Sequence, residues 1–337
     1  MSCETIGTVG LRMRTADATR RRILTLLGAT AATLFSVRGE AQTRQLDLSS
    51  YFLGPTLVGN GGQLLADKAT TDSAGTIQIA LEMAAPTMPF QMMSKASALA
   101  HYYAAEFASV ELLFGLSALP MLAATFDEAE TLLRLARPHY ISALARHGQI
   151  LLATEPWRPA ALWSTFALRS AADFKGIKFA QPNYVGDRVG WERTFTRLGV
   201  ENVSFPDAEL ILSNGYGGNM KFTQEFGCFM EIFFAAQLNF LTVSREVFDS
   251  LTEAQRHVLV AAGRDTELIL WKSSRELLDR DHRAIAARGV SVATHPPRDV
   301  LAALRSAAEP DVQGWSRAMG VIGTTLLADY RRSIGRE

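Results

Sequence analysis

The chain has 337 residues, and its 34 basic residues balance its 34 acidic residues. A chain of this length that is 48% hydrophobic can bury a large core and is expected to form about two domains. A surface that binds nucleic acid, or a polybasic surface that binds membranes, requires a marked excess of basic residues. The charge balance therefore argues against both of these classes.

The first 41 residues have the layout of an export signal. Arg20, Arg21 and Arg22 precede an apolar stretch over residues 23–35, and Gly39-Glu40-Ala41 provides a small-x-small cleavage site. The paired arginines followed by Ile and Leu also fit the twin-arginine export pattern. The apolar stretch is too short to cross a bilayer, which needs about 20 residues.

We therefore expect residues 1–41 to be removed near Ala41 and the mature chain to work in the periplasm. An ordinary basic amphipathic N-terminus is the alternative interpretation. The start codon is either Met1 or Met13, and the sequence does not choose between them. Removing the six basic and three acidic residues of this segment leaves 28 basic and 31 acidic residues. Only Cys228 remains, so the mature chain has no intrachain disulfide.

Strand and helix patterns alternate through the first half of the mature chain, which predicts βαβ units with parallel strands. The predicted strands cover residues 46–51, 76–83, 108–116 and 149–153. The predicted helices cover residues 58–70, 92–103 and 126–147.

A second series of elements follows. Strands are predicted over residues 163–167 and 177–180, with a capped helical turn over 170–176. Helices are predicted over 185–198 and from 207–212 onward. Residues 239–243 are predicted to form a strand that crosses back to the first lobe.

A long helix is predicted over residues 252–288. Thr252 and Gln255 form a capping-box start, and Gly289 is a plausible C-cap. About 37 residues make a helix of about 55 Å, which is long enough to brace two lobes. Two shorter helices with a bend near Gly263 are the alternative.

Common catalytic and cofactor motifs are absent from the sequence. It contains no HExxH, no GxSxG and no GxxxxGK[ST] motif. Gly215-Tyr216-Gly217-Gly218-Asn219-Met220 begins like a dinucleotide-binding GxGxxG motif but has Met at the third glycine. We therefore predict no catalytic residues, no metal and no cofactor, and a binding function in place of an enzymatic one.

Four motifs, in the right order, resemble a known family. The A-D-x-K-G-x-K run at 172–178 is similar to a signature of the substrate-binding proteins of tripartite ATP-independent periplasmic (TRAP) transporters, the DctP-type solute receptors. The resemblance continues in G-x-x-x-L-P at 115–120, P-x-x-E-L at 206–210 before Gly215, and S-x-x-x-F-x-x-L-T-x-x-Q at 244–255. It covers residues 46–330.

The resemblance implies an α/β, two-lobed periplasmic-binding-protein fold, in which each lobe is a sheet flanked by helices and a long helix braces both lobes. Residues 42–155 would form lobe I and residues 156–240 lobe II. Residues 241–337 would supply the return strand, the bracing helix 252–288 and a C-terminal segment shared by both lobes. The implied partners are one small solute and the membrane permease subunits of a TRAP transporter, so that the protein meets the membrane only through the permease.

The chain departs from the family pattern at Ala180. Family members usually carry Arg there, two residues after the signature's second Lys, where it pairs with the carboxylate of the solute. Arg158 is the first candidate to supply the missing charge, and Arg188 is a weaker one. The usual carboxylate solute is therefore in question.

Aromatic and polar residues around this position suggest an aromatic or weakly acidic organic solute. Tyr102 and Tyr103 are expected to face the pocket from lobe I. The predicted solute-binding residues are Tyr51, Trp157, Arg158, Trp163, Gln181, Asn183, Tyr184, Asn219, Phe222 and Asn239. Trp163 and Phe179 have an alternative role as core residues, because neighbours on a strand alternate faces.

Two other functions remain open at this stage. One alternative is an exported enzyme on the same two-lobed scaffold, with Glu231 and His101 as a speculative acid–base pair. The other is a sensory binding module that reports to a membrane partner. The sequence identifies neither the solute nor the oligomeric state.

Overall fold

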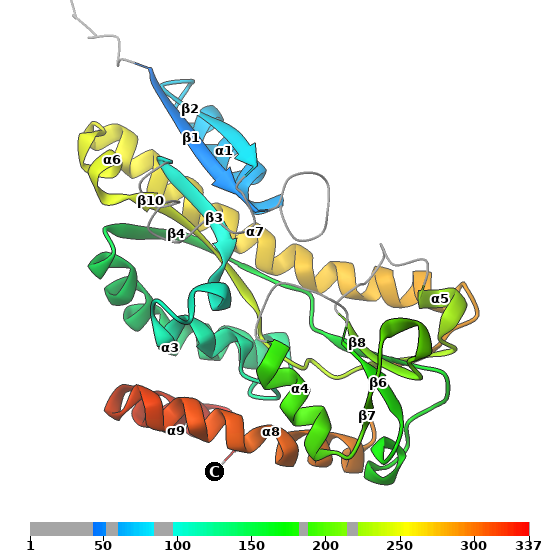
Figure 1. The fold of residues 1–337 in the computed structure, drawn as a ribbon. Helices are drawn as coiled ribbons and strands as arrows, with labels where there is room; N and C mark the ends of the chain where they lie inside the picture. The colour runs from blue at the N-terminus through cyan, green and yellow to red at the C-terminus, as the bar shows by residue number, and fades with distance from the viewer. Residues whose placement is uncertain (1–42, 52–59, 84–96, 182–187, 214–221, 337) are drawn as a thin grey trace, which may run out of the picture. The chain divides into compact units, whose positions relative to one another are not determined.

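The computed structural model describes residues 43–51, 60–83, 97–181, 188–213 and 222–336, and the predicted export signal lies outside them. Two sheets organise this part of the chain (Figure 1). In both sheets, central strands are buried on both faces, because helices or loops cover each face.

The first sheet has five strands in the order β2-β1-β3-β10-β4. These strands are β1 (Arg44–Ser50), β2 (Ile77–Met83), β3 (Leu99–Tyr103), β4 (Gln149–Pro156) and β10 (Leu238–Ser244). β1 runs parallel to β2 and β3, whereas β10 is antiparallel to β3 and β4. The strand predicted at 239–243 therefore does return to the first sheet.

The second sheet has six strands in the order β11-β9-β5-β8-β6-β7. They are β5 (Ala161–Ser164), β6 (Lys178–Ala180), β7 (Glu201–Asn202), β8 (Leu210–Ser213), β9 (Cys228–Glu231) and β11 (Ser291–Ala293). β6 is parallel to β7 and β8, and β5 is antiparallel to β8 and β9. Both sheets are therefore mixed, and the prediction of parallel sheets was only partly correct.

Helices cover the sheets on both sides. The α-helices are α1 (Asn60–Asp72), α3 (Phe126–Arg146), α4 (Arg188–Arg197), α5 (Phe222–Glu225), α6 (Arg245–Ser250), α7 (Glu253–Ala286), α8 (Arg298–Met319) and α9 (Val321–Ser333). The 3₁₀ helices are η1 (Ala104–Phe107), η2 (Leu112–Ala118), η3 (Ala171–Phe174) and η4 (Phe205–Asp207).

The core of the first sheet lies on both of its faces. Leu48 and Leu241 pack with Leu65 of α1 and Leu259 of α7 on one face. On the other face, Phe240 lies 4.9 Å from Tyr140 of α3, measured between ring centroids. Each fully buried side chain of this size contributes about 1.5–3 kcal/mol relative to leaving it exposed.

The long helix α7 is continuous over 34 residues (Figure 1). Thr252 and Gln255 form the predicted capping box, and Gly289 adopts a φ of 86°, which favours glycine. Gly263 lies against Leu152 of β4 in the first sheet, and the ring of His282 lies 5.6 Å from that of Phe229 in the second. One continuous helix therefore contacts both sheets, which confirms the bracing prediction.

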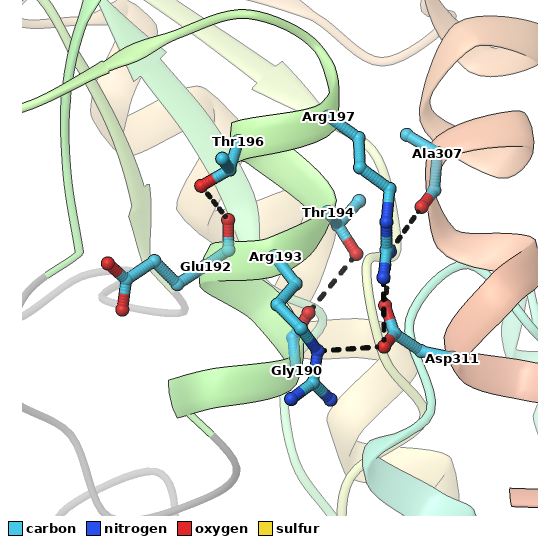
Figure 2. A network of polar contacts seen from close by, with 8 residues as sticks. All are labelled: Gly190, Glu192, Arg193, Thr194, Thr196, Arg197, Ala307 and Asp311. Carbon is cyan, nitrogen blue, oxygen red and sulfur yellow. Dashed lines mark hydrogen bonds and ion pairs between the residues drawn. The ribbon is translucent and has the colours of Figure 1, made fainter. Parts of the chain in front are cut away.

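Helix α4 is held against α8 by a polar network (Figure 2). Arg193 Nε donates to Asp311 Oδ1 (2.9 Å), and Arg197 Nη1 donates to Asp311 Oδ2 (2.5 Å) and to Ala307 O (2.7 Å). Burial opposes ionisation of Asp311, but hydrogen bonds from the two arginines lower its pKa overall. The carboxylate therefore joins the two helices outside the second sheet.

Three element predictions were wrong. Residues 99–103 form strand β3, although a helix was predicted over 92–103, and residues 207–212 contain strand β8 where a helix was predicted. Both strands are buried along their whole length, and a short apolar run without polar gaps has no periodicity to separate strand from helix. The strand predicted at 108–116 is instead the 3₁₀ helix η2.

Smaller differences concern element bounds. The strand predicted at 163–167 lies two to three residues earlier, as β5. Strands β9 and β11 and helices α8 and α9 had no predicted counterpart. The other predicted elements agree with the structure to within a few residues.

Candidate functional site

Parallel strands of both sheets end close to where the chain crosses between the sheets. In the first sheet, β1 ends at Ser50 and β3 at Tyr103. In the second sheet, β6 ends at Ala180 and β8 at Ser213. Open α/β sheets bind ligands outside the carboxyl ends of their strands, so these strand ends are where a candidate site is expected.

Two crossing segments, residues 157–160 and 232–237, connect the sheets and run together. Trp157 N donates to Gln237 O (2.9 Å), and Phe234 N donates to Ala160 O (3.3 Å). These bonds tie the two crossings to each other beside the strand ends.

Glu155 is the centre of a buried polar network in the first sheet. Its Oε2 accepts a hydrogen bond from Asn239 Nδ2 (2.7 Å) and lies 2.7 Å from His101 Nε2. Its Oε1 accepts a hydrogen bond from Gly61 N at the start of α1 (3.2 Å). Ser50 Oγ lies 3.0 Å from His101 Nδ1. The network joins β1, β3, β4 and β10 near the strand ends.

A serine hydroxyl, an imidazole and a carboxylate in a row are the residue types of a hydrolase triad. Here Ser50 and His101 are 0% exposed and Glu155 is 1% exposed. The row is therefore fully buried, and its contacts connect β1, β3 and β4. Sequence analysis missed this network, although Glu155 at the end of an apolar strand was a visible signal.

Two predicted solute contacts, Trp157 and Asn239, lie together in this network. Trp157 Nε1 donates to Asn239 Oδ1 (2.6 Å), and the Trp157 ring lies 5.0 Å from that of Tyr103. Gln237 Nε2 in turn donates to the Tyr103 hydroxyl (2.8 Å). Asn239 is 0% exposed and Trp157 is 8% exposed. Both polar ends of the Asn239 amide therefore bind protein atoms of the first sheet and its crossing.

Arg158 on the first crossing forms a buried ion pair with Asp281 of α7. Its Nη1 lies 2.5 Å from Asp281 Oδ2, and the two side chains are 3% and 4% exposed. Burial raises the pKa of Asp281, and the positive charge of Arg158 opposes that rise. The guanidinium that was predicted to bind a solute carboxylate is therefore already paired with the carboxylate of Asp281 on α7.

Glu231 at the end of β9 pairs with His282 of α7, and the Nε2–Oε2 distance is 3.0 Å. The speculative acid–base pair of Glu231 with His101 is therefore wrong, because His101 pairs with Glu155. The two carboxylates bind different histidines on different elements.

Trp163 and Ala180 point to the same face of the second sheet. Both lie opposite Ile211 in the strand register, and the Trp163 ring lies 5.8 Å from Phe222. Phe179 points to the opposite face and stacks on Phe195 at 4.2 Å. Trp163 is 1% exposed, and its Nε1 is buried with no hydrogen-bond partner among the residues that the structure describes.

Two more unsatisfied polar atoms belong to the strand ends. Gln181 Oε1, just after β6, is buried and has no hydrogen-bond partner within the described ranges. The same holds for Glu106 Oε2 in η1, just after β3. The sequence prediction missed Glu106 because it did not recognise the strand that precedes it.

Glu106 is close to Tyr51 after β1. Burial raises the pKa of Glu106 to about 7. Burial, and secondly the charge of Glu106, raise the pKa of Tyr51 to about 12. A carboxyl group that titrates near neutral pH therefore lies beside a predicted solute contact.

We expect Glu106→Gln to increase the free energy of unfolding at pH 8 and to leave it nearly unchanged at pH 4. The carboxyl of Glu106 is mainly protonated in both the folded and the unfolded state at pH 4, because this pH lies below its pKa in each state. Above pH 7 the folded state must bury a charge that Gln lacks. The gain is at most about 2 kcal/mol, because solvent screens this partly exposed group. Urea unfolding at both pH values measures it, and an equal effect at both would contradict the assignment.

Three of the predicted contacts, Asn183, Tyr184 and Asn219, lie outside the described residues, and the side chain of Arg188 is likewise not described. Among the described helices, none is long and apolar enough to span a membrane. In the same ranges, no three His, Cys, Asp or Glu residues gather closely enough to hold a metal ion.

Neither protein-family models nor curated protein sequences match this chain. Solved structures do match. The Bordetella pertussis extracytoplasmic solute receptor DctP6, which binds pyroglutamic acid, has a TM-score of 0.73 at 19% identity, covering 86% of this chain and 100% of that one. The fold is that of TRAP periplasmic solute-binding proteins.

Two further TRAP solute-binding proteins support the same assignment of fold. One from Ochrobactrum anthropi has a TM-score of 0.75 at 17% identity and covers 88% of this chain and 98% of its own, with its C-terminus bound in its ligand pocket. One from Rhodoferax ferrireducens with bound malonate has a TM-score of 0.69 at 15% identity, covering 86% and 98%. The TRAP fold thus extends over most of the chain.

Proposed function

We propose that this chain is the extracytoplasmic solute receptor of a TRAP-type secondary transporter. It captures one small organic solute between two lobes and delivers it to a separate membrane permease, without changing the bonds of the solute. The observation that carries the proposal is the TRAP fold, which covers 86% of the chain. Two paired crossings and one long helix connect the two sheets.

The proposed lobes follow the strands. Lobe I comprises residues 42–155 and lobe II residues 156–240, and residues 241–337 add the brace and a shared C-terminal segment. Contacts of α8 with α4 and of α9 with α3 support the sharing of that segment. The N-terminal export signal, with its twin-arginine pattern, supports a periplasmic location after cleavage near Ala41.

The solute-binding residues remain those predicted from the sequence, and the geometry favours some of them. Trp163 Nε1 and Gln181 Oε1 are a buried donor and a buried acceptor without partners among the described residues. Leaving such a group unsatisfied costs about 1–3 kcal/mol. A solute that bonds to them would recover this cost. Arg158 would contribute its positive charge while remaining beside Asp281.

A thermal-shift panel tests the proposal. The ligand-free chain is screened with organic acids, aromatic acids, amides and neutral polyols. One class is expected to stabilise the folded state by about 2.7 kcal/mol at a concentration one hundred times its Kd. A folded, ligand-free sample that responds to no class, or one that turns over the bound compound, would contradict a receptor function.

The Arg158→Lys variant then tests the role of the guanidinium in the same panel. If the solute is a carboxylate, Lys keeps the charge opposite Asp281 but loses the planar fork, so the affinity should fall at least tenfold. Arg193→Lys, outside both strand-end regions, is the matched control and should leave the Kd unchanged. An unchanged Kd for Arg158→Lys would remove this residue from the site.

A further inference from the structure

A small pocket of about 100 Å³ lies between α8, α9 and residues 120–122, away from the strand ends. Three arginines line it, namely Arg305, Arg331 and Arg336. Glu309, Tyr330 and Leu122 also line it. None of these residues belongs to the proposed solute site.

Two of the arginines are already matched with carboxylates. Arg331 Nη2 donates to both oxygens of Glu309 (2.7 and 2.9 Å). Arg336 Nη2 donates to both oxygens of Glu128 (2.7 and 2.6 Å). Each of the two carboxylates therefore pairs with one arginine, and neither pairs with the third arginine, Arg305.

Arg305 has no hydrogen bond and no ion pair within the part of the chain that the structure describes. Its side chain is half-buried, and its Nε is buried without a partner. Burial, and secondly the positive charge of Arg336, lower the pKa of Arg305. Among the described residues, three guanidiniums and two carboxylates leave this region with one excess positive charge, on the guanidinium of Arg305.

The pocket wall is firmly held. Tyr330 Oη and Arg336 Nη1 both donate to Leu122 O, each at 3.1 Å. Met121 adopts a φ of 56°, uncommon for a residue with a side chain, and its N donates to Phe234 O (2.6 Å). The backbone next to Arg305 is therefore fixed by contacts on both sides, so a ligand would enter a preformed pocket.

We propose that Arg305 is the anchor of a second binding site, which takes a small oxyanion such as a phosphate or carboxylate group. A planar guanidinium binds both groups through paired hydrogen bonds. One water needs about 10–15 Å³ of such a cavity, so about 100 Å³ has room for a group of several heavy atoms. Such an anion would neutralise the excess positive charge beside the guanidinium of Arg305.

The test follows the arginine Nε–H signals of the full chain by nuclear magnetic resonance. Sodium phosphate and sodium acetate are titrated separately at constant ionic strength, with chloride as the balancing anion. The Arg305 signal, identified by its loss in Arg305→Gln, is expected to shift saturably with at least one of the two anions. Phosphate alone would assign the site to phosphate groups, and acetate alone to carboxylates.

Arg317→Gln is the matched control, because it removes the same charge from an exposed position of α8 outside this pocket. The apparent affinity of the active anion is measured from the thermal stabilisation that it causes. It should fall at least tenfold in Arg305→Gln and stay within twofold of the parent in Arg317→Gln. Because Arg305 forms no hydrogen bond or ion pair among the described residues, both variants should retain the parent circular dichroism spectrum. A shift that never saturates, or equal losses in the two variants, would overturn the site.

Discussion

Replacement of Glu155 by alanine is expected to lower the free energy of unfolding by about 3–5 kcal/mol. The change removes the acceptor that Asn239 Nδ2, His101 Nε2 and Gly61 N share, while all of these groups stay buried. It also leaves a cavity at the point where four strands of the first sheet meet. Urea unfolding of the variant and the parent at pH 7 measures the difference.

Glu276→Ala is the matched control for Glu155→Ala. Glu276 is an exposed residue of α7 whose carboxylate lies 3.9 Å from Lys272 Nζ, and its loss should change stability by less than about 0.5 kcal/mol. Glu155→Gln should fall between the two, because Gln keeps one acceptor oxygen but directs an NH₂ group at other donors. Similar values for Glu155→Ala and Glu276→Ala would show that the network does not stabilise the fold.

Replacement of Gly263 by alanine should destabilise the chain by about 2–3 kcal/mol, although alanine favours helices by about 1 kcal/mol over glycine. A Cβ at this position would lie 2.7 Å from Leu152 O and 3.0 Å from Leu152 C. Because both are backbone atoms of strand β4, which is held to β10 in the first sheet, α7 itself would have to move away from β4. Thermal unfolding should show a clear loss in the variant.

Gly314→Ala in α8 provides the opposite control. No heavy atom lies within 4 Å of a Cβ at this position, so only the helix propensity remains. Stability should rise by up to about 1 kcal/mol. Two changes of the same chemistry are therefore expected to have opposite signs. Stabilisation by Gly263→Ala would mean that α7 does not pack on β4 as closely as the structure has it.

Gly263 also shows why sequence patterns alone misjudge some residues. In the sequence it is a helix-weakening glycine and the natural place to expect a bend. In the structure it is the place where a continuous helix touches the backbone of a strand 111 positions earlier in the chain. The distance between the two backbones, and not helix propensity, selects glycine there.

The candidate site was only partly predictable. Trp157 lies on the first crossing, Trp163 within β5 and Gln181 just after β6, and their role as solute contacts stays a prediction. Their partners come from distant segments: Asn239 for Trp157, and Asp281 for Arg158. Glu106 was missed because the preceding strand β3 was not recognised, whereas Glu155 had a visible signal at the end of the apolar strand β4.

Local rules were sufficient for the features that depend on neighbouring residues. The long helix with its capping box, the capped turn before Gly176 and the order of most strands and helices follow from periodicity and from Ser, Thr and Gly at element ends. The assignment of short apolar runs such as β3 and β8, the mixed strand directions and every buried charge pair depended on the tertiary structure. These features arise from contacts between segments far apart in the chain, whose energies exceed local propensity and leave no periodic pattern in the sequence.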